Sequence, residues 1–188
     1  MLTRAPQRLA FIVCLCGSLF AVEKSGIWLD VPFVKQEKDG CGSAVVAMVM
    51  QYWAQQRPKS VNGGPPAGGA ASDPAVIQQA LYSAKAKGIY ASDMERYLQK
   101  HGFRTFVFRG TWDDLKLHLE KGRPLIVALR PAPGEKARHY VVLAGLDWEQ
   151  NLVLVNDPAQ KKLIKEERNA FEKEWTAVGR WTLLAVPE

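Results

Sequence analysis

The sequence has 188 residues, of which 47% are hydrophobic and 23% are charged, with 25 Lys and Arg residues against 19 Asp and Glu residues. A chain of this length fits one domain, because domains typically hold about 100–150 residues. The composition excludes a disordered chain, a collagen-like repeat and a disulfide-dense mini-protein. Charges of both signs are mixed, as in residues 161–174, and form no basic stripe, so we expect no nucleic-acid partner.

The N-terminus has the pattern of a secretory signal. Arg4 and Arg8 precede an apolar run of 14 residues, 9–22, with small residues near its end. This run is shorter than the roughly 20 residues that span a bilayer. We therefore interpret residues 1–21 as a signal peptide and expect an exported protein, periplasmic or secreted. The alternative is an uncleaved membrane anchor with the domain outside the cytoplasm, which is the only membrane contact that we expect.

Removal of this segment leaves Cys41 as the single cysteine, so no intramolecular disulfide can form. It follows an extended apolar segment, residues 27–34. Apolar residues recur at helical spacing after Cys41, which predicts that a helix begins at or beside it; they are Ala44, Val45, Met48, Val49 and Tyr52. A helix N-terminus favours the thiolate over the thiol. Cys41 is therefore a candidate nucleophile, and a small buried hydrophobic residue is the alternative.

Helix signals continue after the Gly- and Pro-rich residues 57–72, which we interpret as a flexible loop. Asp73 before Pro74 is typical of a helix start. Ser92 and Glu95 have the spacing of a capping box. Cap and breaker residues together predict three helices, over residues 73–87, 92–102 and 111–122.

Apolar segments in the second half of the chain predict an antiparallel sheet. The expected strands cover residues 103–109, 125–130, 139–146, 152–155 and 180–186, with a helix over residues 168–175. The strands at 139–146 and 152–155 are separated by a polar turn and form a predicted hairpin. We expect an α+β fold in which a helical N-terminal half packs on this sheet, with residues 22–188 as one domain.

The chain has three histidines from which a catalytic base could come. His101 ends a predicted helix and is interpreted as a partner of the helix dipole. His118 lies between two leucines of a short predicted helix and is interpreted as a surface or half-buried filler. His139 opens a predicted strand, at the end of the sheet, where site residues often lie. His139 is therefore the candidate base.

Asp157 is expected to lie beside His139, although 18 positions separate them in the sequence. In an antiparallel hairpin, the start of the first strand lies close to the end of the second. A carboxylate at that point could orient the imidazole. The alternative is an ordinary Asp-Pro turn residue, since Pro158 follows.

Gln36 lies five residues before Cys41 and is the candidate oxyanion donor. Its side-chain N–H and the backbone N–H of Cys41 could together stabilise the oxyanion of acyl transfer. An exposed loop glutamine is the alternative. Gln36, Cys41, His139 and Asp157 in this order form a complete papain-like set.

Two segments that carry these residues, 31–53 (VPFVKQEKDGCGSAVVAMVMQYW) and 139–158 (HYVVLAGLDWEQNLVLVNDP), resemble the double-glycine, or bacteriocin-processing, cysteine peptidases of the papain-like group. The resemblance implies a papain-like cysteine peptidase fold, a peptide or protein substrate, and a preference for small residues such as Gly-Gly before the cut bond. The sequence contains no P-loop, so we expect a stand-alone exported member, and a separate transporter partner stays open.

Two other functions use the same residues or the same fold. A thiol acyl-transfer enzyme, such as a ligase or transpeptidase, needs the same nucleophile and base. A non-catalytic module that binds leader peptides needs only the fold. We expect no cofactor and no metal, because one cysteine and three dispersed histidines lack any metal-ligand spacing.

Overall fold

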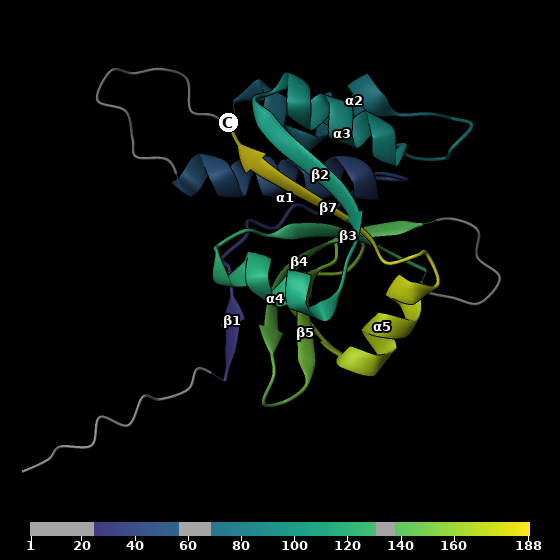
Figure 1. Ribbon diagram of the computed structural model, residues 1–188. Coiled ribbons are helices and arrows are strands. Elements are labelled where there is room, and N and C mark those ends of the chain that lie inside the picture. The colour runs from purple at the N-terminus through teal and green to yellow at the C-terminus, as the bar shows by residue number, and fades with distance from the viewer. Residues whose placement is uncertain (1–24, 57–68, 131–137) are drawn as a thin grey trace, which may run out of the picture.

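The computed structural model describes residues 25–56, 69–130 and 138–188 (Figure 1). The predicted signal peptide, residues 1–21, and most of the predicted loop, residues 57–68, lie outside the described residues. Among the described residues, no helix is both long enough and apolar enough to cross a membrane.

The helices form two groups. Three of them lie together on one side of the molecule, above strands β3, β4 and β5 in Figure 1: α1 (Cys41–Gln56), α2 (Pro74–Leu81) and α3 (Ala91–Lys100). A 3-10 turn, η1 (Ala70–Ser72), precedes α2. The other two, α4 (Trp112–Glu120) and α5 (Arg168–Thr176), lie against the lower part of the sheet.

The described strands form one antiparallel sheet in the order β2-β7-β3-β4-β5-β6, and β1 pairs with the end of β4. Their bounds are β1 (Gly26–Trp28), β2 (Phe103–Arg109), β3 (Leu125–Leu129), β4 (His139–Asp147), β5 (Leu152–Asn156), β6 (Ile164–Glu167) and β7 (Trp181–Pro187). The predicted α+β architecture, a helical N-terminal half against an antiparallel sheet, is therefore confirmed.

The core lies on both faces of the sheet, because side chains of a strand alternate between its two faces. On one face, α1 packs against β4 residues Tyr140, Val142 and Ala144. On the other face, residues of α4 and α5 pack against Val141 and Leu143 of the same strand. Strand β4 is thus buried from both sides, which holds the start of the strand, His139, firmly in place.

Two of the predicted helix boundaries are wrong. Helix α2 ends at Leu81 and not near residue 87, because the chain becomes extended at Tyr82 and turns back through a bridge between Ser83 and Gly88. Helix α3 begins after Tyr90 and has no side-chain cap, so the predicted capping box of Ser92 and Glu95 does not form. A capping box forms instead at α4, between Thr111 and Asp114.

The strands differ from the prediction mainly at the edges of the sheet. Of the extended segment 27–34, only residues 27 and 28 belong to a strand, β1; the next residue, Leu29, donates its backbone N–H to the Ala144 carbonyl of β4 at 2.8 Å. Strand β6 was not predicted, because its four residues carry three charges; pairing with β5 stabilises it. Gly145 permits the close approach of β1, since a Cβ atom there would lie 2.5 Å from the Ile27 carbonyl oxygen.

Candidate active site

Cys41 is the first residue of α1 and is half-buried. The chain reaches it through a tight turn, in which Asp39 has a φ of 56° and the Gly40 N–H donates to the Glu37 carbonyl at 3.0 Å. The Ser43 hydroxyl donates to the Gly40 carbonyl at 2.9 Å, which holds this turn against the helix. The predicted helix start is therefore confirmed, and the thiol lies at the positive end of the helix dipole.

His139 and Asp157 are brought together by the β4–β5 hairpin, as the sequence predicts. The Nε2 atom of His139 lies 2.7 Å from Oδ1 of Asp157, with the two side chains only 19% and 6% exposed. Since Nε2 is engaged by the carboxylate, Nδ1 is the ring nitrogen that remains for a second partner. Cys41 faces the same side chain, because its hydrogen bond and its negative charge are among the causes that raise the pKa of the His139 imidazole.

Asp157 is held as an oriented carboxylate. Its Oδ1 also accepts the Ala159 N–H at 2.8 Å, and its Oδ2 accepts Nε2 of Gln160 at 2.7 Å. Burial alone would raise the pKa of Asp157, but the hydrogen bond and charge of His139, with the two further hydrogen bonds, hold this pKa below its ordinary value. The carboxylate is thus ionised and fixed in orientation.

His139 favours its protonated form strongly. Burial lowers the pKa of its imidazole, but the hydrogen bonds to Asp157 and Cys41 and the negative charges of these two partners outweigh burial and raise the pKa to about 9. An imidazolium between a carboxylate and a thiolate is the ion pair from which a cysteine nucleophile attacks.

This raised pKa predicts a pH-dependent stability. A pKa of about 9 in the folded chain, against 6.5 for an unperturbed imidazole, stabilises the fold fully below pH 6.5, and this contribution is lost as the pH rises toward 9. The size is about 3 kcal/mol, because each pKa unit corresponds to about 1.4 kcal/mol. Urea unfolding at pH 6 and pH 9 would measure it. The variant His139→Asn should show a clearly smaller loss over this range, and an equal loss would contradict the assignment.

Asn156 connects the hairpin to the segment before Cys41. It is fully buried; its side-chain N–H donates to the Val31 carbonyl at 3.1 Å, and its Oδ1 accepts the Leu163 N–H at 2.9 Å. In the sequence, Asn156 is visible only as part of the polar turn after β5. The tertiary structure reveals its hydrogen bond to Val31, which lies 125 positions earlier in the chain.

Gln36 is tied to the same turn through its backbone, whose N–H donates to the Pro158 carbonyl at 2.9 Å. The segment from Gln36 to Cys41 therefore connects the Asp157 turn to the start of α1. The Gln36 side chain is half-buried, and its Oε1 atom is buried without a hydrogen-bond partner. A buried polar atom without a partner costs stability.

Three further residues near this site were not singled out in the sequence. Gln160 orients Asp157, as described above. Glu166 of β6 has a pKa raised to about 7 by burial and by the negative charges of Glu174 and Asp157, with His139 opposing. Burial likewise raises the pKa of Glu174. Strand β6 and helix α5 bring these two carboxylates close to the hairpin. Both lie in a segment of mixed charges, so the sequence carries no signal for this proximity.

The other two histidines lie away from this constellation. His101 caps the end of α3 with its ring 4.3 Å from that of Tyr97, and burial, with the charge of Lys100, lowers its pKa. The expected role as a charged partner of the helix dipole is therefore not supported. His118 is half-buried beside Phe108, as expected of a filler.

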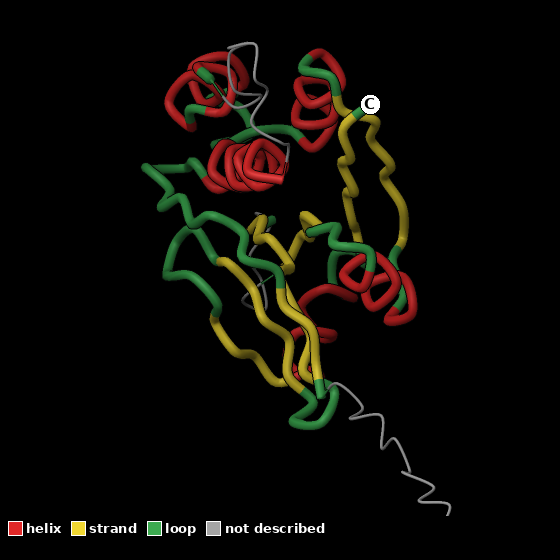
Figure 2. The backbone as a smooth tube through the Cα atoms, turned by 90° about the vertical axis from the view of Figure 1, so that its left-hand side faces the viewer, coloured by secondary structure: helices red, strands yellow, loops and turns green. Residues whose placement is uncertain are grey.

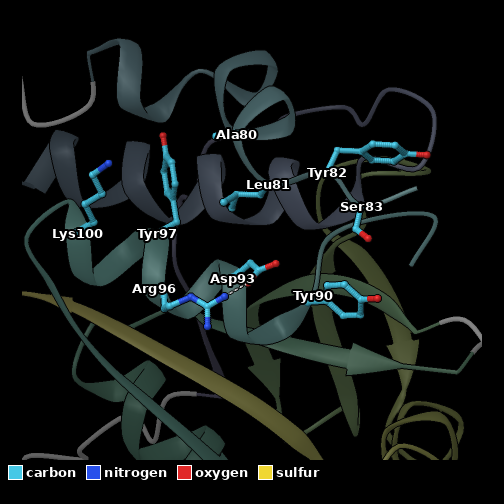
Figure 3. Close-up of a pocket in the computed structure, with 9 residues that line it drawn as sticks. All are labelled: Ala80, Leu81, Tyr82, Ser83, Tyr90, Asp93, Arg96, Tyr97 and Lys100. Atoms are coloured by element: carbon cyan, nitrogen blue, oxygen red, sulfur yellow. Dashed lines mark hydrogen bonds and ion pairs between the residues drawn. The ribbon is translucent and has the colours of Figure 1, made fainter. Parts of the chain in front are cut away.

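A cavity of about 580 Å³ lies on the helical layer, between the end of α2 and helix α3 (Figure 3). Tyr82 and Tyr90 line it, and each is nearly half exposed. Tyr90 follows Ile89, whose side chain packs against Gly42, the residue after the candidate nucleophile.

The described residues contain no group of three or more His, Cys, Asp or Glu side chains that could hold a metal ion.

The sequence matches the Peptidase_C39 like family over residues 28–182. The chain belongs to this family. It is therefore a cysteine peptidase, and the resemblance to the double-glycine peptidases is confirmed. Membership favours an enzyme over a module that only binds peptides. No curated protein sequence matches the chain.

Solved structures share the fold of this C39-like peptidase. A Bacillus anthracis protein described as a C39-like peptidase is 19% identical, with a TM-score of 0.65, over 87% of this chain and 98% of the other. The peptidase domain of Streptococcus ComA, a bi-functional ABC transporter, is 22% identical, with a TM-score of 0.61, over 83% and 98%. A double glycine motif protease from an AMS/PCAT transporter, in complex with the leader peptide, is 20% identical, with a TM-score of 0.58, over 86% and 94%.

Proposed function

We propose that this C39-like peptidase hydrolyses peptide bonds through Cys41, His139 and Asp157, with Gln36 as an oxyanion donor. The observation that carries the proposal is the 2.7 Å contact between His139 Nε2 and Asp157 Oδ1, which leaves Nδ1 for the Cys41 thiol at the start of α1. This arrangement supports the proposed roles of a nucleophile, its base and the group that orients the base.

In the proposed reaction, the Cys41 thiolate attacks the carbonyl carbon of the scissile peptide bond. The negative charge on the carbonyl oxygen is stabilised by the Cys41 backbone N–H and the Gln36 amide. His139 then gives its proton to the leaving amine as the carbon–nitrogen bond breaks and a thioester forms. A water molecule, deprotonated by His139, hydrolyses the thioester and releases the acid and the free enzyme. Asp157 keeps the ring in orientation throughout.

The oxyanion role predicts a large effect of Gln36→Ala on the rate alone. Loss of one oxyanion donor should lower kcat by roughly 10²–10³, with little change in KM, because the donor acts mainly on charge that develops in the transition state. Steady-state kinetics would measure both constants. The matched control is Gln51→Ala, which removes a half-buried amide that instead donates to the Ser72 carbonyl. A near-normal kcat for Gln36→Ala would assign Gln36 a loop role.

For specificity, we propose that small residues, glycine above all, precede the cut bond. The proposal rests on family membership and on the similarity to a double glycine motif protease. Its physical basis would be a cleft beside Cys41 that is too narrow for large side chains. Mass spectrometry of a cleaved peptide library should show cuts after Gly-Gly fastest, then Gly-Ala, then bulky pairs, and no cuts with Cys41→Ala. Fastest cleavage after leucine or arginine would overturn the specificity but leave the four site residues in place.

Acyl transfer is the second candidate, because an amine in place of water would use the same thioester. Cys41 is half-buried, so either acceptor, water or an amine, could reach a thioester on its sulfur. Product analysis in the presence of a peptide amine separates the two, since a ligated product has the mass of both partners.

We also propose that the chain is exported, on the pattern of Arg4, Arg8 and the apolar run that follows. N-terminal sequencing of the extracytoplasmic protein should find a start between Leu19 and Glu23. An intact Met1 on a membrane-bound form would favour the uncleaved anchor, and a transporter partner would then be sought in the same membrane.

A further inference from the structure

The segment that carries the proposed oxyanion donor is held to the β4–β5 hairpin at two points. In Figure 2, loops (green) connect strands of the sheet to the group of three helices at the top, and residues 29–40, between β1 and α1, form one such connection. The Val31 carbonyl accepts from Nδ2 of Asn156 at 3.1 Å. Five residues later, the Gln36 N–H donates to the Pro158 carbonyl at 2.9 Å. The segment is therefore tied to the last residue of β5 and to the turn after it.

Asn156 is fully buried, and each end of its side-chain amide has a partner in a different part of the chain. Nδ2 donates to Val31, whereas Oδ1 accepts the N–H of Leu163, just before β6, at 2.9 Å. An ionised carboxylate has no proton for the first partner, and an apolar side chain would leave both partners unpaired. The amide fits this position because it joins a donor and an acceptor.

Neighbouring positions at the end of β5 serve the two halves of the proposed site. Asn156 is paired with Val142 of β4, whose side chain packs with α1, so the Asn156 side chain lies on the α1 face of the sheet. The next residue, Asp157, contacts His139. The end of this strand thus holds the donor segment through Asn156 and the proposed base through Asp157.

The Gln36 side chain depends on its backbone for its position. Its Oε1 atom is buried and has no hydrogen-bond partner that would hold the amide in place. An oxyanion donor is effective only at about 2.7–3.1 Å from the developing charge, and a misplacement of about 1 Å can lower a rate roughly 10²-fold. Loosening of the segment should therefore lower the rate even when the Gln36 amide is present.

We propose that Asn156 is a positioning residue that holds Gln36 in place for oxyanion stabilisation, because it ties Val31 to the end of β5. This inference rests on the proposed peptidase function, and in particular on the oxyanion role of Gln36. Asn156 is fully buried, so it acts through the segment and not on the reacting atoms. Its substitution should therefore have little effect on the rate once the Gln36 amide has been removed.

A double-mutant cycle tests this role. Asn156→Ser is the first variant, because a serine hydroxyl lies closer to the backbone and cannot reach both partners of the asparagine amide. With the library peptide that the wild type cleaves fastest, we expect kcat to fall about 10–10²-fold in this variant. In a Gln36→Ala background, the same substitution should change kcat less than about twofold, because the two residues act as a unit. A normal kcat in Asn156→Ser, or an equal loss in both backgrounds, would overturn the proposal.

Thiol alkylation and a matched control separate this role from a general effect on the fold. Alkylation of Cys41 by iodoacetamide needs no oxyanion donor, so its rate in Asn156→Ser should stay within about twofold of the wild-type rate. Equal slowing of alkylation and turnover would contradict the proposal. The control is Tyr97→Phe, which removes a hydrogen bond from another buried side chain to a backbone carbonyl, that of Ala71, at 2.8 Å. It should leave kcat unchanged, and a loss equal to that of Asn156→Ser would also refute the positioning role.

Two further variants keep the test decisive. If Asn156→Ser does not fold, the cycle is repeated with Asn156→Asp, which keeps the size of the side chain and the acceptor for Leu163 but has no donor when ionised. Gln36→Ala alone separates the two proposals. A normal kcat in that variant would refute the oxyanion role of Gln36 and this inference with it. A low kcat there beside a normal kcat in the Asn156 variant would refute only the positioning role.

Discussion

Replacing Cys41 with alanine should lower turnover at least about 10⁴-fold, because the substitution removes the sulfur that is proposed to attack the peptide carbonyl. Removal of a covalent nucleophile leaves only the modest catalysis that comes from substrate binding and oxyanion stabilisation. The effect should appear in kcat and in kcat/KM alike, since the attack occurs only on the way to the transition state. Cleavage of a peptide library by the two forms, followed by mass spectrometry, measures it.

The fold should survive this substitution. Cys41 is half-buried at the first residue of α1, where the turn is held by Gly40 and Ser43 and not by the sulfur. The melting temperature of Cys41→Ala should lie within a few degrees of that of the wild type, which would exclude unfolding as the cause of inactivity. If Cys41→Ala still cleaves peptides at the wild-type rate, the thiol peptidase chemistry proposed for this site is wrong.

The second large effect is expected from His139→Ala. The variant removes the proposed base and acid together, and general acid–base catalysis contributes about 10²–10⁴ to the rate. It also removes the imidazolium beside Cys41, so the thiolate loses its counter-ion. We therefore expect turnover to fall about 10³-fold or more and alkylation of Cys41 by iodoacetamide at neutral pH to slow.

Alkylation makes this test independent of the unknown substrate, because it reports the thiolate directly. His101→Ala is the matched control, since His101 packs against Tyr97 at the end of α3 and does not contact the hairpin turn. It should alter neither alkylation nor turnover by more than a small factor. Alkylation of His139→Ala at the wild-type rate would show that the helix N-terminus alone sustains the thiolate.

The local parts of this site were predictable from the sequence because each depends on residues close in the chain. The helix that begins at Cys41 follows from apolar spacing over residues 44–52, and its start is confirmed. The contact of His139 with Asp157 follows from hairpin geometry, since a short polar turn joins the two strands. The sequence also predicts a helix over residues 111–122, and α4 begins at Trp112 directly after Thr111, whose side chain caps it.

The tertiary structure decided everything that depends on contacts between distant segments. The bond from Asn156 to the Val31 carbonyl joins the β4–β5 hairpin to the segment before Cys41, and no local pattern encodes it. Strand β6 forms only because β5 offers an edge to its charged residues. Strand β7 enters the sheet between β2 and β3, which leaves β2 at the edge. Spacing and turn chemistry specify helices and hairpins, whereas the burial of each face against a distant partner specifies how they assemble.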